Sequence, residues 1–420
     1  MAQTVANLTD VLKEAWTSDR LEKQFLDDTD FLDRVDKESS EVRTTKIGEK
    51  AIVPLHKGRS GGYTSTSSAG GSLNAADAQK VDSAEYTLVY HWFQTALETG
   101  ALNQSTGGDS SAVVAKDLEL QGAVSDVANQ CMRQIATNSD SIIATCGTTT
   151  TSATVVLAAD SATAYGVGAI VRGWLYKGLK VDIGTTSDTD AVVAGATIVS
   201  VDEVNGTITI DSSVSTTANT HKVYIANPNS GTAFNPELEG LRSMAGSTTS
   251  ALGGLDPDNA GEEFWKPAYV DTTTTVLSLA LLLRMRRGIH QKTGKKDRRP
   301  FVLSGLKQED AYYSLLQNQV RFGSDNVSAG NSDSVQFGNY DWVGSPNILD
   351  TDVFMLTLKD FVRVTGTGIT KPTWVSDLQG SNNGMLWSAG TTQFADAVVY
   401  PWALGMRRRN GSSAALSLTA

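Results

Sequence analysis

The sequence predicts an α+β fold in which extended arms surround a mixed body that carries a separate, inserted β-rich region. Two segments, 1–41 and 42–93, hold apolar side chains in patterns that cannot form a core of their own. A long amphipathic helix follows at 110–137. The composition then changes sharply over 147–229 to Thr, Val, Ala, Ser, Asp and Gly, which indicates short strands.

Length, composition and charge exclude several classes of protein. The 420 residues suffice for two or three domains, and 40% hydrophobic with 19% charged residues describes a soluble, foldable chain. The central apolar run Val276–Leu283 is far shorter than the ~20 residues of a bilayer span, and Met1–Asp10 has no features of a secretory signal. The net charge of −11 argues against a general nucleic-acid binder. Cys131 and Cys146 lack a disulfide or zinc motif and are predicted to be buried thiols.

Residues 1–41 are predicted to be a charged N-terminal arm. The arm begins with apolar residues at helical spacing, and a sparser series of apolar residues continues through the acidic stretch Asp27–Asp36. The first pattern comprises Leu8, Val11, Leu12, Ala15 and Trp16, and the second comprises Leu21, Phe25, Leu32 and Val35. We expect the arm to lie on another surface of this subunit or of a neighbour, with Trp16 and Phe25 as contact residues.

Residues 42–93 are predicted to form a long β-hairpin. Lys50–Leu55 and Glu85–Phe93 have strand patterns, the second with Tyr86, Leu88, Tyr90 and Trp92 on one face. Ten of the fifteen residues from Gly58 to Ser72 are glycine or serine, which predicts a tip that is either disordered or ordered by a partner. The residues expected to contact a neighbour here are Lys57, Arg59 and Tyr63.

The body begins with a helix over Ser110–Thr137, whose apolar face is predicted to comprise Leu120, Val124, Val127, Cys131 and Ile135. The inserted region is predicted to be a small β-barrel or sandwich with a hairpin turn at Asn205-Gly206. Its expected strands are Val155–Leu157, Ile170–Tyr176, Thr197–Val201, Thr207–Ile210 and Lys222–Ile225.

After Pro236 the pattern predicts an α/β segment. Helices are expected over Thr275–Ile289 and Glu309–Val320. Strands are expected over Pro300–Ser304, Tyr340–Val343, Val353–Leu356, Phe361–Val364 and Phe394–Met406, the last closed by Arg407-Arg408-Arg409.

Candidate catalytic motifs fail on their context. Gly58–Gly62 matches the G-x-S-x-G pattern around Ser60, but the residues that follow are poor helix formers, whereas a nucleophile elbow needs a helix there. The turn beginning at Asp256 lacks the glutamate that a calcium loop needs at its twelfth position, which is Pro267. The histidines form no metal-binding pair and are each predicted to be exposed or hydrogen-bonded: His56, His91, His221 and His290. The sequence therefore predicts no enzyme, cofactor or metal site.

A basic run at 284–299 is the strongest charge feature. It comprises Arg284, Arg286, Arg287, Lys292, Lys295, Lys296, Arg298 and Arg299. Three interpretations stay open: contact with nucleic-acid phosphates, a solvated helix end that complements the helix dipole, or ion pairing with acidic surfaces of neighbouring subunits such as the N-terminal arm. No aromatic residues interleave the run, which counts against single-strand binding.

Several phrases and the order of these parts resemble one family. Phe31–Val35 followed by Ala51–His56 is similar to the arm-to-hairpin junction of tailed-phage major capsid proteins with the Hong Kong 97-type fold. Ala128–Gln134 resembles the end of their spine helix, and Leu404–Asn410 resembles their closing strand. The resemblance extends over nearly the whole chain.

The resemblance implies a division of the chain. Residues 1–41 would be the N-arm and 42–93 the extended loop across a neighbour, and 94–146 would hold the peripheral domain with spine helix 110–137. The insertion domain would be 147–229, the axial domain mainly 230–365, and 366–420 would return to the peripheral domain.

The resemblance also implies partners. The chain would assemble with itself as hexamers and pentamers into an icosahedral head around double-stranded DNA, inside the host bacterial cytoplasm, with a portal and, in some members, a decoration protein. The arm is too short for the scaffolding segment that some members carry, which implies a separate scaffolding protein or a removed segment. Some members crosslink subunits through an extended-loop lysine. Lys57 lies near that place, but no asparagine or carboxylate matches, so this chemistry is not carried over.

Alternatives come from three classes. An encapsulin-like cellular compartment would share the fold, although the insertion and the basic run favour a phage. A phage decoration protein or adhesin would explain the Thr/Val/Ser-rich middle, but that composition stops at Asn229 and an α/β segment follows. A hydrolase using Ser60 would lose its activity in Ser60→Ala.

Overall fold

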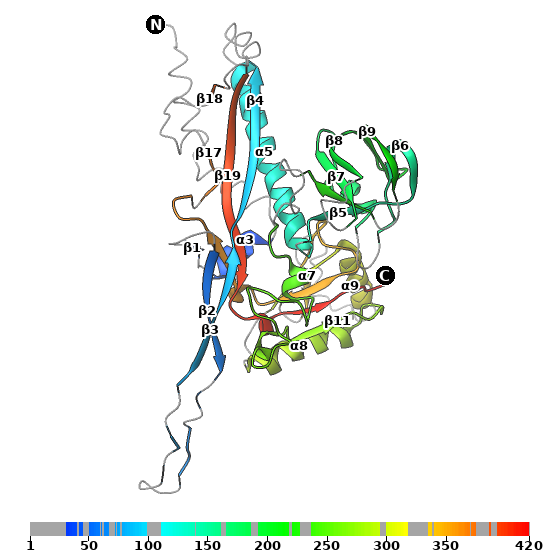
Figure 1. Cartoon of the computed structure of the whole chain (residues 1–420). Helices are drawn as coiled ribbons and strands as arrows, with labels where there is room; N and C mark the ends of the chain where they lie inside the picture. Colours follow the sequence, from blue (N-terminus) through cyan, green and yellow to red (C-terminus); the bar gives the residue numbers. More distant parts are fainter. Residues whose placement is uncertain are drawn as a thin grey trace, which may run out of the picture.

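The computed structural model shows an elongated molecule with a hairpin at one end, a long helix and two long strands at the other, and a mixed body between them (Figure 1). An antiparallel sheet stands beside the body. The structure describes residues 31–39, 42–44, 50–58, 60, 63–66, 72, 74–75, 78–98, 111–138, 140–160, 165–185, 192–217, 221–226, 237–294, 300–317, 335–337, 340–369, 371–374, 386–387 and 393–419.

A long helix and two long strands form the spine of the molecule. Helix α5 (Ser111–Ala136) lies along β4 (Val89–Glu98) and β19 (Gln393–Met406), as Figure 1 shows. Val124, Cys131 and Ile135 are buried on one helix face, which confirms the predicted helix and its apolar side. Three short strands pair with the other edge of β19: β16 (Phe361–Thr365), β17 (Thr373–Trp374) and β18 (Leu386–Trp387). The strand β1 (Val42–Thr44) pairs in turn with β16.

The hairpin consists of β2 (Lys50–Gly58) and β3 (Lys80–Thr87), paired antiparallel. The predicted strand Glu85–Phe93 is divided at Leu88, because β3 pairs with β2 whereas β4 pairs with β19. The prediction of a single shared face was therefore wrong. Tyr86 and Leu88 are buried, but Tyr90 and Trp92 are 47% and 61% exposed.

The inserted region forms one six-stranded antiparallel sheet with its own apolar core. Cys146 and Leu157, the residues directly after its two outer strands, form an isolated antiparallel bridge, so the sheet is barrel-like. The Asn205-Gly206 hairpin is confirmed, with Gly206 at a φ of 61° and too close to Val167 for a side chain. The strands are β5 (Ile142–Thr145), β6 (Thr149–Val156), β7 (Lys180–Gly184), β8 (Val193–Asp202), β9 (Thr207–Thr217) and β10 (Lys222–Ile225).

The predicted strand Ile170–Tyr176 is instead the short helix α6 (Gly168–Val171) followed by turns. The carboxylate of Asp160 accepts hydrogen bonds from the backbone N–H groups of Gly166 and Gly168, which folds this segment into a turn before the helix. Trp174 then buries its ring against Tyr165. The apolar residues are thus buried by a compact turn rather than by strand pairing.

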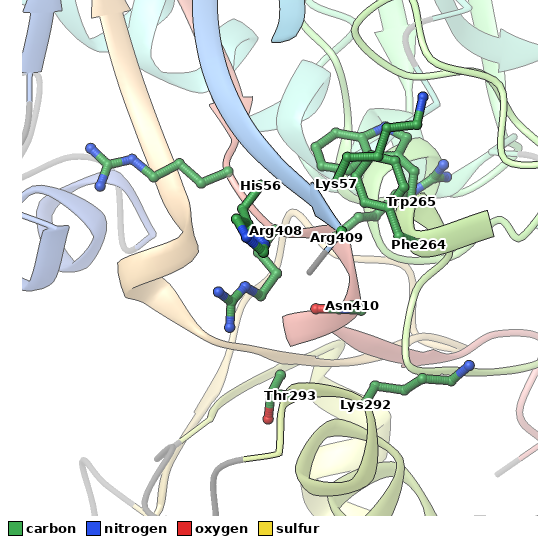
Figure 2. A pocket seen from close by; sticks show the side chains of 11 residues that line it. His56, Lys57, Phe264, Trp265, Lys292, Thr293, Arg408, Arg409 and Asn410 are labelled. Carbon is green, nitrogen blue, oxygen red and sulfur yellow. The ribbon is translucent and has the colours of Figure 1, made fainter. Parts of the chain in front are cut away.

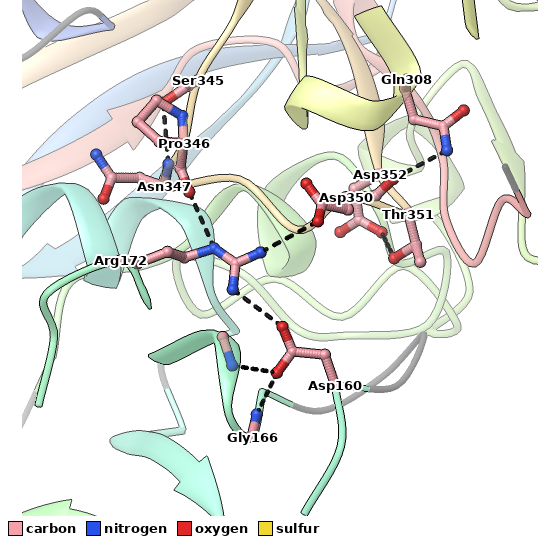
Figure 3. Close-up of polar contacts among 11 residues, drawn as sticks. Asp160, Gly166, Arg172, Gln308, Ser345, Pro346, Asn347, Asp350, Thr351 and Asp352 are labelled. Atoms are coloured by element: carbon pink, nitrogen blue, oxygen red, sulfur yellow. Dashed lines mark hydrogen bonds and ion pairs between the residues drawn. The ribbon is translucent and has the colours of Figure 1, made fainter. Parts of the chain in front are cut away.

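Arg172 connects the inserted sheet to the body (Figure 3). Its guanidinium donates to the carbonyl of Pro346 at 2.9 Å, and it pairs with Asp160 at 3.0 Å and with Asp350 at 3.8 Å. Trp174 Nε1 donates to the Asn347 side chain at 3.2 Å. The inserted sheet is therefore held against the loop at 345–352.

Residues on the two sides of the inserted region meet at the end of α5. Arg133 near the end of α5 forms a buried ion pair with Glu237, where the chain returns. Gln134 accepts a hydrogen bond from the Leu238 N–H at 3.2 Å. The returning chain is thus tied to the end of the spine helix.

The third sheet has helices packed on it and forms the rest of the body. Helix α8 begins at Leu279 rather than at Thr275, because the Ser278 side chain accepts the Leu281 N–H and caps the helix there. Gly294 ends it at a φ of 65°. The strands are β11 (Tyr269–Asp271), β12 (Phe301–Ser304), β13 (Val335–Phe337), β14 (Tyr340–Gly344), β15 (Val353–Leu356) and β20 (Ser413–Ala415). The helices are α7 (Leu241–Met244), α8 (Leu279–Thr293) and α9 (Leu306–Gln317), with short 3-10 turns η3 (Glu263–Trp265), η4 (Leu358–Asp360) and η5 (Arg409–Gly411).

The described end of the arm, α3 (Leu32–Ser39), packs on this subunit. Phe31, Leu32 and Val35 are buried, and the Phe31 ring meets the Phe361 ring edge-on at 5.4 Å. The expected helix around Trp16, and Phe25, lie outside the described residues. No described helix combines the length and apolar content that crossing a membrane needs.

Candidate functional site

The hairpin exposes apolar side chains on one face while its root packs on the body. Along β2, Val53 and Leu55 are buried, whereas Ile52 is 62% exposed. Val81 on β3 is 75% exposed and Tyr63 beyond β2 is 83% exposed. A two-stranded hairpin of this kind is marginally stable alone in water. Its outer face is therefore a candidate contact surface.

Polar contacts hold the two sides of the hairpin together away from the body. Asn74 donates its backbone N–H to Thr64 Oγ1 at 2.8 Å and its side-chain amide to the Tyr63 carbonyl at 3.0 Å. His56 Nε2 lies 2.8 Å from the Gln79 side-chain oxygen. These contacts order the hairpin sides, but they cover none of its exposed apolar residues.

Lys57 at the end of β2 is a paired cation. Its ammonium donates to Asp82 at 2.9 Å. That hydrogen bond raises the pKa of Lys57, and it lowers the pKa of the Asp82 carboxyl. The ammonium also lies 6.0 Å from the centre of the Phe264 ring. Because amine nucleophilicity needs the neutral form, this environment does not favour covalent chemistry at Lys57.

A pocket of about 340 Å³ opens at the root of the hairpin (Figure 2). Four separate segments build it: the end of β2, the turn η3, the end of α8 and the residues after β19. Its lining contains five lysine and arginine side chains and no carboxylate. The lining residues are His56, Lys57, Gly58, Phe264, Trp265, Lys292, Thr293, Arg407, Arg408, Arg409 and Asn410.

One of these cations is structural. Arg409 is buried and donates to the carbonyls of Ser243, Met244, Ser247 and Ser250, at distances of 2.7–2.8 Å. Burial lowers the pKa of Arg409 to about 10, so it remains charged at neutral pH. It thereby satisfies carbonyls at the end of α7 and in the loop after it.

Helix α8 distributes the first half of the basic run rather than gathering it. Arg284 and Arg287 are exposed on the helix, and the Arg286 guanidinium lies 5.7 Å from the centre of the Tyr340 ring. Lys292 reaches the pocket. The remaining residues of the run, Lys295, Lys296, Arg298 and Arg299, lie outside the described part of the chain.

Two histidines differ from what the sequence predicted for them. His91 and His290 each bury Nε2 without a hydrogen-bond partner among the described residues, so the prediction that every histidine is exposed or satisfied was wrong. Burial and the nearby Arg133 charge lower the pKa of His91 to about 4. Arg59 lies outside the described residues. After Ser60, residues 63–66 are not helical, as the argument against a nucleophile elbow expected.

Chemistry-bearing clusters are few in the described ranges. No group of three or more His, Cys, Asp or Glu side chains there could hold a metal ion. Cys131 and Cys146 are buried thiols that form no disulfide, as predicted. The pocket itself was missed by sequence reasoning. Its one signal is the run Arg407–Asn410, which marks the end of β19 but does not reveal that Lys57 and Lys292 lie beside it.

Comparison with known proteins identifies the fold. No family model matches the chain, and no curated protein matches it in sequence. A solved cyanophage A-1(L) capsid subunit covers 92% of this chain and 93% of its own length, at 10% identity and a TM-score of 0.53. A satellite phage P4 procapsid subunit, solved with the size determination protein, covers 96% and 91% at 10% identity and a TM-score of 0.43. A capsid subunit of a native GTA particle covers 93% and 90% at 8% identity and a TM-score of 0.46.

The likeness to the cyanophage subunit extends over nine tenths of both chains. The chain therefore has the Hong Kong 97-type capsid fold, an α+β fold, as the sequence resemblance implied.

Proposed function

We propose that this chain, which has the Hong Kong 97-type fold, is the major capsid protein of a tailed phage and builds an icosahedral head around double-stranded DNA. The observation that carries the proposal is the fold likeness to a cyanophage capsid subunit over nearly the whole chain. Fold alone does not establish function, so the surfaces must support it.

The hairpin supports a shell-building role on physical grounds. Ile52, Val81 and Tyr63 expose apolar area on an element that has only two strands. Such an element gains stability by lying on another subunit, and wrapping contacts add to the ~1,600 Å² of a single compact interface. In this proposal, 42–93 is the extended loop across a neighbour, and Lys57, Arg59 and Tyr63 lie in that contact.

The remaining regions and partners complete the proposal. Residues 1–41 form the N-arm, 94–146 and 366–420 the peripheral domain, 230–365 mainly the axial domain, and 147–229 an insertion domain. Hexamers and pentamers assemble in the host bacterial cytoplasm with a separate scaffolding protein and a portal. A decoration protein and non-specific DNA contact through exposed basic residues such as Arg284 are further parts of it. The chain acts without catalysis, cofactor, metal or membrane.

Electron microscopy of the purified chain, alone and with a scaffolding partner, tests the proposal directly. We expect closed shells with five-fold and six-fold clusters. Small monomers under every condition would contradict it. Shells that enclose a co-expressed enzyme, and that lack a portal, would instead favour an encapsulin-like compartment.

Substitutions on the hairpin sharpen this test. Ile52→Asp with Val81→Asp places charge on the exposed apolar face, so we expect shells to be lost while circular dichroism stays unchanged. Val204→Asp is the matched control, because Val204 is 94% exposed in a turn of the inserted sheet. Normal shells from the hairpin variant would refute the role assigned to this face. A denaturing gel of mature shells, in which the chain runs as a monomer, checks that Lys57 forms no crosslink.

A further inference from the structure

The cationic pocket at the hairpin root contains charges that the fold itself does not use. Lys57 is paired with Asp82, and Arg409 is committed to backbone carbonyls. The Lys292 ammonium and the Arg408 guanidinium, by contrast, have no hydrogen bond or ion pair with any residue that the structure describes. Two unpaired cations therefore line one concave site.

The lining explains which ligand chemistry the pocket suits. It has no carboxylate to compensate Lys292 and Arg408, so an incoming anion gains charge-assisted hydrogen bonds, and the guanidinium can hold a carboxylate with two parallel bonds. Asn410 also lines the pocket, and its Oδ1 is buried without a partner among the described residues. That oxygen accepts a hydrogen bond, which an N–H or O–H donor can supply.

These features favour a polypeptide over a nucleic acid. A peptide supplies both carboxylates and backbone N–H donors, whereas a phosphate backbone supplies only acceptors. A volume of about 340 Å³ accommodates a few side chains, but it does not admit a duplex. The Phe264 ring adds an apolar wall for the stem of an acidic side chain.

We propose that this pocket binds an acidic polypeptide segment, whose carboxylates pair with Lys292 and Arg408 and whose backbone donates to Asn410. Because His56–Gly58 end β2 and Lys292 ends α8, a bound segment bridges the root of the hairpin to the body. Occupancy therefore restrains the direction of the hairpin. Binding takes place on the unassembled chain, so this inference stands or falls independently of the shell-forming role.

Two sources could supply such a segment. One is the chain's own stretch Asp27–Asp36, which has five aspartates in ten residues, the densest acidic stretch of the sequence. Phe31, which lies within this stretch, contacts Phe361. Phe361 pairs with Met406, the residue directly before Arg407 of the pocket lining. The other source is an acidic segment of a different polypeptide.

Fluorescence anisotropy on the full-length, unassembled chain tests the proposal. The probes are a labelled peptide spanning Gln24–Asp36, the same peptide with asparagine for every aspartate, an unrelated peptide of equal charge, and a short DNA duplex. We expect the acidic peptides to bind and the asparagine peptide not to bind. Arg408→Ala and Lys292→Ala should each weaken binding about tenfold or more, since a charged hydrogen bond contributes about 1.5–3 kcal/mol.

Matched variants separate the pocket from general attraction. Arg287→Ala removes an equal charge from the same helix, outside the pocket, and should change binding less than about twofold. Thermal melts verify that each variant folds. Tighter peptide binding in the Asp27→Asn, Asp28→Asn, Asp30→Asn variant assigns the chain's own stretch as the resident ligand, and unchanged binding assigns another polypeptide.

Three results would overturn the inference. The first is no binding of either acidic peptide, both to the unmodified chain and to the Asp27→Asn, Asp28→Asn, Asp30→Asn variant, and the second is equal loss in Arg287→Ala and Arg408→Ala. The third is DNA binding that depends on Lys292 and Arg408 while the peptides fail to bind, which would make the pocket a nucleic-acid contact.

Discussion

Replacing Asp352 by asparagine removes one half of a buried ion pair and leaves the other half without compensation. Arg242 Nε and Nη2 donate to the two carboxylate oxygens of Asp352, at 2.6 Å and 3.0 Å. The side chains are 5% and 0% exposed, so water cannot replace the lost charge. Asparagine keeps the shape but turns an amide donor toward a guanidinium. Breaking a buried pair in this way costs about 3–5 kcal/mol of unfolding free energy.

The pair joins α7, where the chain has returned from the inserted sheet, to the residue before β15. Urea unfolding of the unassembled chain, followed by tryptophan fluorescence, measures the loss. With a slope of about 3 kcal/mol per molar, the midpoint falls by on the order of 1 M. Hydrogen exchange at the Gly305 amide, which donates to the Asp352 carbonyl at 3.1 Å, reports the same change locally.

Two controls decide whether the reasoning holds. Asp350→Asn removes a neighbouring, partly exposed carboxylate that lies 3.8 Å from Arg172, and should cost less than about 1 kcal/mol. The double variant Arg242→Met with Asp352→Leu should lose less than Asp352→Asn, because no buried charge remains. A midpoint for Asp352→Asn equal to that of the unmodified chain would refute the argument, as would a double variant that is less stable than Asp352→Asn.

Two further predictions concern the joint of the inserted sheet and the spine. Arg172→Gln should accelerate hydrogen exchange at the Gly166 and Gly168 amides about tenfold, because their acceptor Asp160 loses its charged partner; unchanged exchange would show that the joint does not depend on Arg172. Burial and the Arg133 charge lower the pKa of His91 to about 4, against 6.5 in the unfolded chain. Between pH 4 and pH 6.5 the unfolded state therefore binds a proton at His91 that the folded state does not bind. Stability should therefore be complete above about pH 6.5 and fall by up to about 3 kcal/mol toward pH 4, as urea midpoints measure, and His91→Leu should flatten that slope. An equal slope in His91→Leu would remove this residue as the cause.

Periodic patterns predicted the long elements well. The spine helix, the long strand β19 and the Asn205-Gly206 hairpin lie where the sequence placed them, because each carries its own local signal of apolar spacing or turn chemistry. The predictions that were wrong concern segments in which tertiary contacts override the local sequence pattern. Ile170–Tyr176 resembles a strand, but the Asp160 carboxylate organises a turn and a short helix there.

Pairing between distant strands decided what alternation could not. Tyr86, Leu88, Tyr90 and Trp92 alternate without interruption, yet the last two are exposed because the chain changes partner from β2 to β19 at Leu88. The candidate pocket has the same origin. Its cations come from segments some 350 residues apart, and no spacing rule relates Lys57 to Arg408.

The sequence by itself determined the fold class, the order of arm, hairpin, spine helix and inserted sheet, and the failure of each catalytic motif. These properties depend on composition and on short-range periodicity, which are present in any segment read alone. Only the tertiary structure decided which face of the hairpin stays exposed, which histidine is buried, and which cations remain unpaired. Those properties depend on what a distant segment brings within a few ångströms, and burial and charge compensation exist only once that contact has formed.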